Sequence, residues 1–326
     1  MAESSWPSPD DGRVVDDVEF EKWNLALGPQ GAVIDYITQT VVFADSTGMQ
    51  VKISADKYAH VRGHTWWSGS STFTKAIASN ASGSTRVDMV VLRLSRTTWN
   101  VTVEVVQGTP GAGAPSATQT INTTGTWEMP LALVTVANGA ATITAGNVTY
   151  VAAHMVTDGK LVVANTTALT YVPGRYTGME VYQLDTGATM VWNGSAWVDK
   201  FGWKDWSAVV YHNMSTTRTT YGSFSVNRAR YNKIGRMVWA SADITVTNAT
   251  TGGLSASLPV AAVSMQNSIV GSGAVINSAG APTQDGFVII GAGLDNVQPV
   301  TFTTGFVNST AGTNRYRFTI CYESAS

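Results

Sequence analysis

Short runs in which apolar and polar residues alternate, or in which β-branched residues dominate, recur along most of the chain. Clusters of Gly, Ser and Asn separate these runs. Such runs between turn residues predict strands, and their spacing favours antiparallel sandwiches or barrels over alternating strands and helices. The predicted strands cover residues 40–43, 49–53, 87–94, 101–106, 131–136, 141–151, 242–246, 287–290, 300–302 and 315–322.

One helix is predicted near the start of the chain, over residues 16–27. An aspartate at its beginning can cap the first turn, and the Gly-Pro pair after Leu27 ends it. Val18, Trp23 and Leu27 fall near one face of this helix. The preceding segment, residues 1–12, is polar and contains prolines, which predicts an extended arm able to dock on a neighbour.

A three-stranded meander is predicted between residues 172 and 198, where turn residues separate three short apolar runs. The dipeptide Asn193-Gly194 is typical of a two-residue hairpin, because both central positions of a type I′ turn need φ > 0. In the register that follows from this turn, Met190 lies opposite Trp197.

The meander has an apolar face formed by Met190, Trp192 and Trp197. Two or three short strands do not hold in water without something to pack against. We predict that three copies pack around an axis, which makes these residues the neck of a trimer. The alternative is that the face packs on a flanking domain of the same chain.

The composition is that of a folded, mostly β protein. The chain has 326 residues, of which 44% are hydrophobic and only 13% charged, so it can fill two ordinary domains and a connector. The net charge of −2 and the lack of a basic run disfavour nucleic acid and anionic lipid as partners. No apolar run is long enough for a bilayer, and the start lacks the pattern of a cleaved signal, so we expect synthesis in a cytosol.

Two histidines four residues apart, His60 and His64, would share one face of a helix and could bind zinc there. Gly63 and the strand-rich context argue against a helix, so we predict a loop between strands instead. The single cysteine, Cys321, excludes an internal disulfide. We expect no metal site and no cofactor.

No catalytic motif is present: the sequence lacks a nucleophile elbow, a P-loop and a dinucleotide-binding fingerprint. We therefore expect no enzyme activity, although the paired carboxylates of a glycosidase are set by the fold and stay open. Several aromatic residues in the last third are predicted to be core or trimer interface, and the alternative is a sugar site on an exposed loop with Asp or Asn nearby. They are Trp203, Trp206, Tyr211, Tyr221 and Trp239.

Three parts of the chain resemble bacteriophage tail proteins. The first part is similar to the amino-terminal region of minor tail proteins from phages of actinobacteria, through Trp6-Pro7, the acidic helix and residues 47–53, 60–63, 86–93, 105–110 and 127–132. Residues 175–182, 185–187 and 192–197 resemble a connector found in tail fibre and tail-tip proteins. Residues 231–239, 242–246 and 254–259 resemble the carboxy-terminal head of tail fibres and receptor-binding proteins.

The resemblance and the strand pattern together predict two antiparallel β-sandwich or jelly-roll-like domains joined by a small meander, with one short helix near the start. The predicted parts are an attachment domain (1–155), a connector or neck (156–205) and a head (206–326). This organisation implies a homotrimeric tail protein of the virion. Its first domain would attach to other tail-tip proteins, and its head would bind a glycan or protein of the host cell surface, without nucleic acid or membrane insertion.

Recognition of the host is expected in loops of the head, over residues 247–253, 278–286 and 291–298, because loops on a rigid scaffold vary without cost to the fold. The alternative is ordinary solvent-exposed turn chemistry. Two rival functions stay open: a purely architectural tail subunit, and a wall-degrading enzyme. The candidate contact residues are Asn248, Asp285, Asp295 and Asn296.

Overall fold

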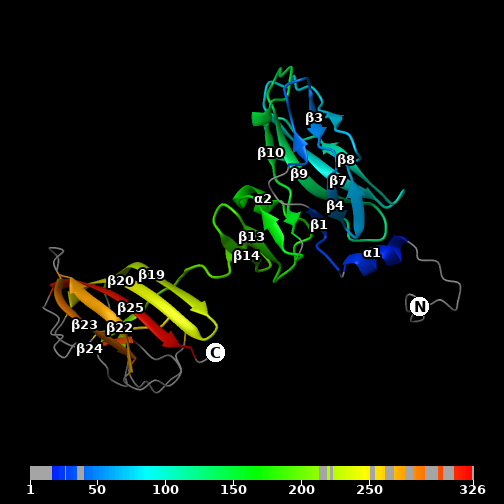
Figure 1. The fold of residues 1–326 in the computed structure, drawn as a ribbon. Coiled ribbons are helices and arrows are strands. Elements are labelled where there is room, and N and C mark those ends of the chain that lie inside the picture. The colour runs from blue at the N-terminus through cyan, green and yellow to red at the C-terminus, as the bar shows by residue number, and fades with distance from the viewer. Residues whose placement is uncertain are drawn as a thin grey trace, which may run out of the picture. The chain divides into compact units, whose positions relative to one another are not determined.

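The structure, a computed structural model, is mainly β, with four antiparallel or mixed sheets (Figure 1). The chain divides into two compact units, Met1–Lys200 and Phe201–Ser326, here called unit 1 and unit 2. The mainly β class is confirmed, and the sandwich arrangement stays a prediction. The structure describes residues 17–25, 27–34, 40–156, 158–212, 219–220, 223–249, 254–260, 268–276, 282–290, 300–303 and 312–324.

Unit 1 contains an eight-stranded sheet that pairs strands of the predicted connector with strands from the start of the chain. In spatial order the strands are β15 (Trp197–Asp199), β14 (Ala188–Trp192), β13 (Glu180–Gln183), β12 (Leu161–Val163), β11 (His154–Met155), β1 (Gly31–Val33), β4 (Tyr58–Val61) and β5 (His64–Trp67). The pairs β12–β13 and β1–β11 are parallel. This sheet is therefore mixed, whereas we predicted antiparallel sheets. The predicted boundaries at residues 155 and 205 remain predictions.

Two smaller sheets also belong to unit 1. One contains, in spatial order, β10 (Val148–Tyr150), β9 (Thr126–Val136), β7 (Arg86–Ser95) and β8 (Asn100–Val106), and a short 3-10 helix, η1 (Ala145–Asn147), precedes β10. The other contains β2 (Val42–Phe43), β3 (Gln50–Ile53) and β6 (Phe73–Ala76).

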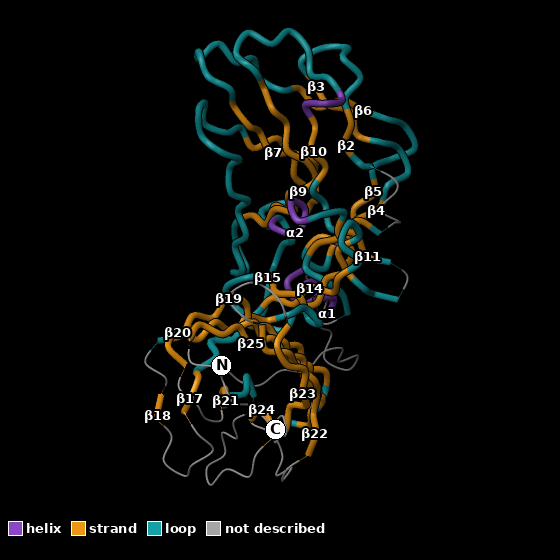
Figure 2. Tube along the Cα trace, turned by 90° about the vertical axis from the view of Figure 1, so that its left-hand side faces the viewer, coloured by secondary structure: helices purple, strands orange, loops and turns teal. Residues whose placement is uncertain are grey.

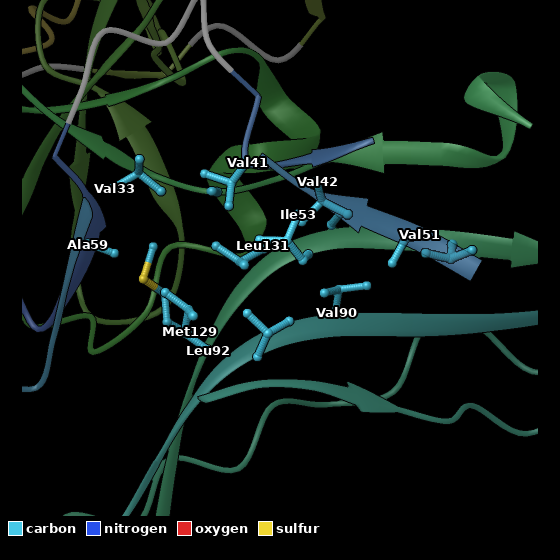
Figure 3. Packing of buried hydrophobic residues seen from close by; sticks show 14 of the residues in the cluster. Val33, Val41, Val42, Val51, Ile53, Ala59, Val90, Leu92, Met129 and Leu131 are labelled. Carbon is cyan, nitrogen blue, oxygen red and sulfur yellow. The ribbon is translucent and has the colours of Figure 1, made fainter. Parts of the chain in front are cut away.

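The largest core of unit 1 draws on both small sheets. Val51 and Ile53 of β3 are fully buried and belong to one cluster with Val90 of β7 and Leu131 of β9 (Figure 3). The polar residues that alternate with them in β3 are only half-buried. Burying each aliphatic side chain contributes about 1.5 to 3 kcal/mol, so the period-two pattern is what fixes this strand against the core.

The predicted meander is present as β13, β14 and β15, but its register differs from the prediction. Trp192 pairs with Trp197, and Met190 pairs with Asp199. The reason is that four residues, not two, close the hairpin: Asn193 accepts hydrogen bonds through its side-chain oxygen from the amides of Ser195 and Ala196. An Asx turn of this kind replaces the type I′ turn.

Helix α1 (Asp17–Leu25) confirms the predicted helix, but not through an apolar face. Trp23 and Leu27 are exposed, whereas Glu21 is only 6% exposed. The Glu21 carboxylate accepts hydrogen bonds from Arg62 at 2.8 Å and from Arg96 at 2.8 and 2.9 Å. The helix is therefore held to the sheets by a buried ionic cluster.

The segment with two histidines is a tight hairpin, so the predicted loop between strands is present and is only two residues long. Arg62 and Gly63 have φ of 50° and 89°, which is the two-residue turn that joins β4 to β5. A side chain at Gly63 would meet the backbone oxygen of Glu21 at 2.9 Å. The histidines stand in the two paired strands, so the absence of a helix here is confirmed.

Unit 2 contains one ten-stranded sheet, in which β19, β20 and β25 lie side by side (Figures 1 and 2). In spatial order the strands are β16 (Lys204–Asp205), β19 (Phe224–Ile234), β20 (Met237–Ala249), β25 (Gly312–Glu323), β22 (Ser268–Ile276), β23 (Pro282–Ile290), β24 (Val300–Thr303), β21 (Leu254–Ala256), β17 (Val210–His212) and β18 (Thr219–Thr220). Its core includes Val238, Ile244, Tyr316 and Phe318, all buried.

Candidate functional site

Where the side chains of β19, β20 and β25 are described, the ten-stranded sheet of unit 2 has one face in the core and one face in solvent. Along β20, Val238 and Ala240 are buried, whereas Trp239 is exposed and Ser241 is half-buried. This alternation places polar and aromatic side chains together on the solvent side. We call this side the outer face, and its residues are Trp203, Arg228, Arg230, Asn232, Trp239, Ser241, Asp243, Ser272, Ala274, Arg315, Arg317 and Thr319.

Two exposed tryptophans stand in one row across the outer face. Asn232 pairs with Trp239, and the register of β16 continues so that Trp203 lies beside Asn232. Trp203 is 47% exposed and Trp239 38%. Since neighbouring strands lie about 4.8 Å apart, the two indoles are separated by roughly 9.6 Å along the row. That separation is on the order of the length of a disaccharide.

Trp203 is held in place by a cation. The guanidinium carbon of Arg230 lies 5.3 Å from the centre of the Trp203 ring, on the same face of the sheet. Such contacts contribute about 0.5 to 1 kcal/mol at exposed sites. The row therefore consists of the Trp203 ring beside Arg230, the amide of Asn232, whose nitrogen donates to the backbone oxygen of Phe201, and the ring of Trp239.

Further along the outer face, Asp243 is the centre of an ionic network. Its carboxylate accepts two hydrogen bonds from Arg315, both at 2.6 Å, one from Arg317 at 2.9 Å and one from Asn227 at 3.0 Å. Burial by itself would raise the pKa of Asp243, but the hydrogen bonds from Arg315, Asn227 and Arg317 outweigh it and lower the pKa to about 2. Asp243 is therefore ionised throughout the physiological range.

The stability contributed by Asp243 is expected to depend on pH. Because its pKa is lowered on folding, the contribution is present above the unfolded value of 3.8 and is lost as the pH falls from about 4 to about 2. Its arginine partners are partly exposed, so we expect about 1 kcal/mol. Urea unfolding of the wild type and of Asp243→Asn should differ most at pH 7 and least near pH 2. A difference that stays constant between these pH values contradicts the assignment.

The predicted neck residues lie in unit 1 and have partners there. Met190, Trp192 and Trp197 are half-buried and pack against the cluster that includes Met179 and Val181. The rings of Trp192 and Trp197 meet edge to face at 5.5 Å. Helix α2 (Thr166–Thr170), capped by the side chain of the preceding asparagine, contributes to the same cluster. This packing agrees with the alternative in which the apolar face of the meander packs on other parts of the same chain. A role of these residues in a trimer stays a prediction.

The predicted contact residues are not gathered in described loops. Asn248 lies in β20, at the irregularity between Val246 and Ala249 in its pairing with β25, and Asp285 lies in β23, paired with Ala274 of β22. Their placement in loops was therefore wrong, while contact with a receptor is still a prediction for them. Asp295 and Asn296 lie outside the described residues.

The aromatic residues of the last third divide into two groups. Trp206 is a core residue, 6.2 Å from Phe318 between ring centres, as predicted. Trp203 and Trp239 are exposed in the single chain, Trp239 on β20 and Trp203 just before β16, so they are not core residues, and the trimer interface stays a prediction for them. Tyr211 belongs to β17, and Tyr221 lies outside the described residues.

The polar residues of the outer face were missed by sequence reasoning. The alternating run from 242 to 246 carried a usable signal, because it sets Asp243 on the face opposite Ile244. No sequence signal marked Asn232 and Arg230, since only pairing with other strands brings them beside the tryptophans.

The histidine pair shows no metal-binding arrangement. His60 Nδ1 lies 2.7 Å from the carbonyl oxygen of Pro29, and His64 packs beside Trp99 and Phe20. Burial lowers the pKa of both histidines. Within the described ranges, no three His, Cys, Asp or Glu side chains gather as a metal site, and no helix is long and apolar enough to cross a membrane.

Comparison of the chain with protein-family models, with curated proteins and with solved structures finds no match. The geometry of the outer face and the sequence resemblance to phage tail proteins are therefore the grounds for a functional proposal.

Proposed function

We propose that this chain is a structural protein of a phage tail that presents unit 2 to the host cell surface, where the outer face binds a glycan. The observation that carries the proposal is the row of Trp203, Asn232 and Trp239 across the outer face, in which both tryptophans are exposed. The hydrogens on the faces of sugar rings are attracted to the electron-rich faces of indoles, and an amide bonds sugar hydroxyls. Rigid strands hold these groups ready, which lowers the entropy lost on binding.

The rest of the proposal comes from the sequence. Residues 1–155 would attach the protein to the tail tip, and residues 206–326 would form a sandwich-like head carried outward by the connector. Three copies would present three outer faces together. Linked weak sites raise avidity by factors of about 10² to 10⁴, which suits a receptor that repeats over a cell wall.

The experiment that tests the proposal is binding of the purified full chain to intact host cells, with reducing sugar assayed in the same samples. Binding without sugar release supports an attachment protein. Absence of binding supports the rival of a purely architectural tail subunit. Release of sugar from the wall supports the other rival, an enzyme.

Assembly into a trimer is expected for the purified chain. Sedimentation equilibrium at micromolar concentration should give three times the chain mass of 34.5 kDa. The physical reason is that jelly-roll-like heads and short meanders gain buried area when three copies meet, as the resemblance implies. A single species at the chain mass over this concentration range contradicts the trimer but leaves the outer face as a binding site untouched.

A further inference from the structure

The outer face contains a hollow beside the tryptophan row. Its volume is about 850 Å³. Small side chains form its floor where β20, β25 and β22 pair, and arginines stand at its rim. The floor residues are Ser241, Thr319, Ser272 and Ala274, and the rim residues are Arg228 and Arg317.

The hollow is rich in hydrogen-bond donors. Asp243, its only acidic lining residue among those described, already accepts four hydrogen bonds, which fills the capacity of a carboxylate. Arg317 donates to Asp243 through Nε, and its side chain is 52% exposed at the hollow. Arg228 is exposed and makes no ion pair with another described residue. A ligand here must therefore supply acceptors.

The charge of the hollow favours an anion. Three arginines, Arg228, Arg315 and Arg317, surround the single carboxylate of Asp243. Among the described side chains these groups leave two net positive charges, on a chain whose overall charge is −2. An arginine fork is the group that matches carboxylate or phosphate oxygens.

We propose that the hollow binds the carboxylate or phosphate group of an acidic glycan whose sugar rings lie over Trp239 and Trp203. Ser241, in the floor, follows Trp239 by two residues on the same face, a separation of about 7 Å. One chain of sugars can therefore reach both places. This inference rests on the proposed function, because it names the chemical class of the glycan at that same face.

The test measures binding of the full chain to three immobilised probes: an oligogalacturonate, which carries carboxylates, poly(glycerol phosphate), and the neutral cellohexaose. We expect at least one acidic probe to bind more tightly than the neutral one, and 0.5 M salt to weaken that binding. Arg228→Gln should weaken it about tenfold, since a hydrogen bond to a charged group is lost. The acidic probe that binds identifies the group as carboxylate or phosphate.

The matched control is Arg236→Gln, which removes the same charge from the turn between β19 and β20, away from the hollow. It should leave binding unchanged. Equal binding of neutral and acidic probes with no effect of Arg228→Gln overturns the inference, as does the absence of binding to both acidic probes. Failure of the proposed function alone gives a different result: the protein then binds the acidic probe as stated but does not bind intact host cells.

Discussion

Replacing Glu21 with alanine is expected to lower the free energy of unfolding of unit 1 by about 3 to 5 kcal/mol. The Glu21 carboxylate lies between Arg62 and Arg96, whose side chains are 10% and 0% exposed. Removing it leaves two cations buried without their partner, which costs far more than the ion pair itself contributes. We expect α1 to detach before the rest of unit 1 unfolds.

Urea unfolding followed by circular dichroism measures this change, and limited proteolysis reports whether α1 detaches. The matched control is Asp45→Ala, which also breaks an ion pair of unit 1, with Lys52, but a solvent-exposed one. It should cost far less than Glu21→Ala, because an ion pair in contact with water contributes little to stability. If both substitutions cost the same, the cluster around Glu21 does not anchor the helix.

Local patterns predicted much of this fold. The helix near residue 20, the strands with alternating residues and the meander that contains Trp192 all follow from periodicity and turn chemistry. The face shared by Met190, Trp192 and Trp197 was also predicted correctly, because the observed register differs from the predicted one by two residues, which keeps each side chain on its face.

What could not be predicted depends on partners far apart in the sequence. Glu21 anchors α1 only because Arg62, in the turn after β4, and Arg96, directly after β7, reach it from far along the sequence. The helix sequence itself carries no sign of these partners. The turn at Asn193 depends on whether its side chain caps the following amides, which the Asn-Gly pair does not decide. The candidate site also depends on pairing between distant segments, since Trp203 and Trp239 are brought into one row only by β19 between them.

Loss of host binding is the largest functional effect that we expect, and it follows from removing both indoles of the outer face. Each large aromatic anchor in a binding site is worth about 2 kcal/mol or more, which is roughly 30-fold in affinity per residue. Three linked copies multiply the loss. Both side chains are partly exposed, so Trp203→Ala with Trp239→Ala should leave unit 2 folded.

The matched control takes two tryptophans of similar exposure from unit 1. Trp23→Ala with Trp67→Ala removes side chains that are 49% and 52% exposed, outside the proposed binding face. This variant should bind host cells as the wild type does. Circular dichroism of both variants checks that the β fold is retained.

The most direct measurement is flow cytometry of intact host cells incubated with fluorescently labelled full-length protein, wild type against the two double variants. The proposal predicts saturable binding of the wild type and of the Trp23 and Trp67 variant, and loss of binding by the Trp203 and Trp239 variant. Undiminished binding by the Trp203 and Trp239 variant, or loss of binding in the unit 1 variant alone, would contradict attachment through the outer face of unit 2.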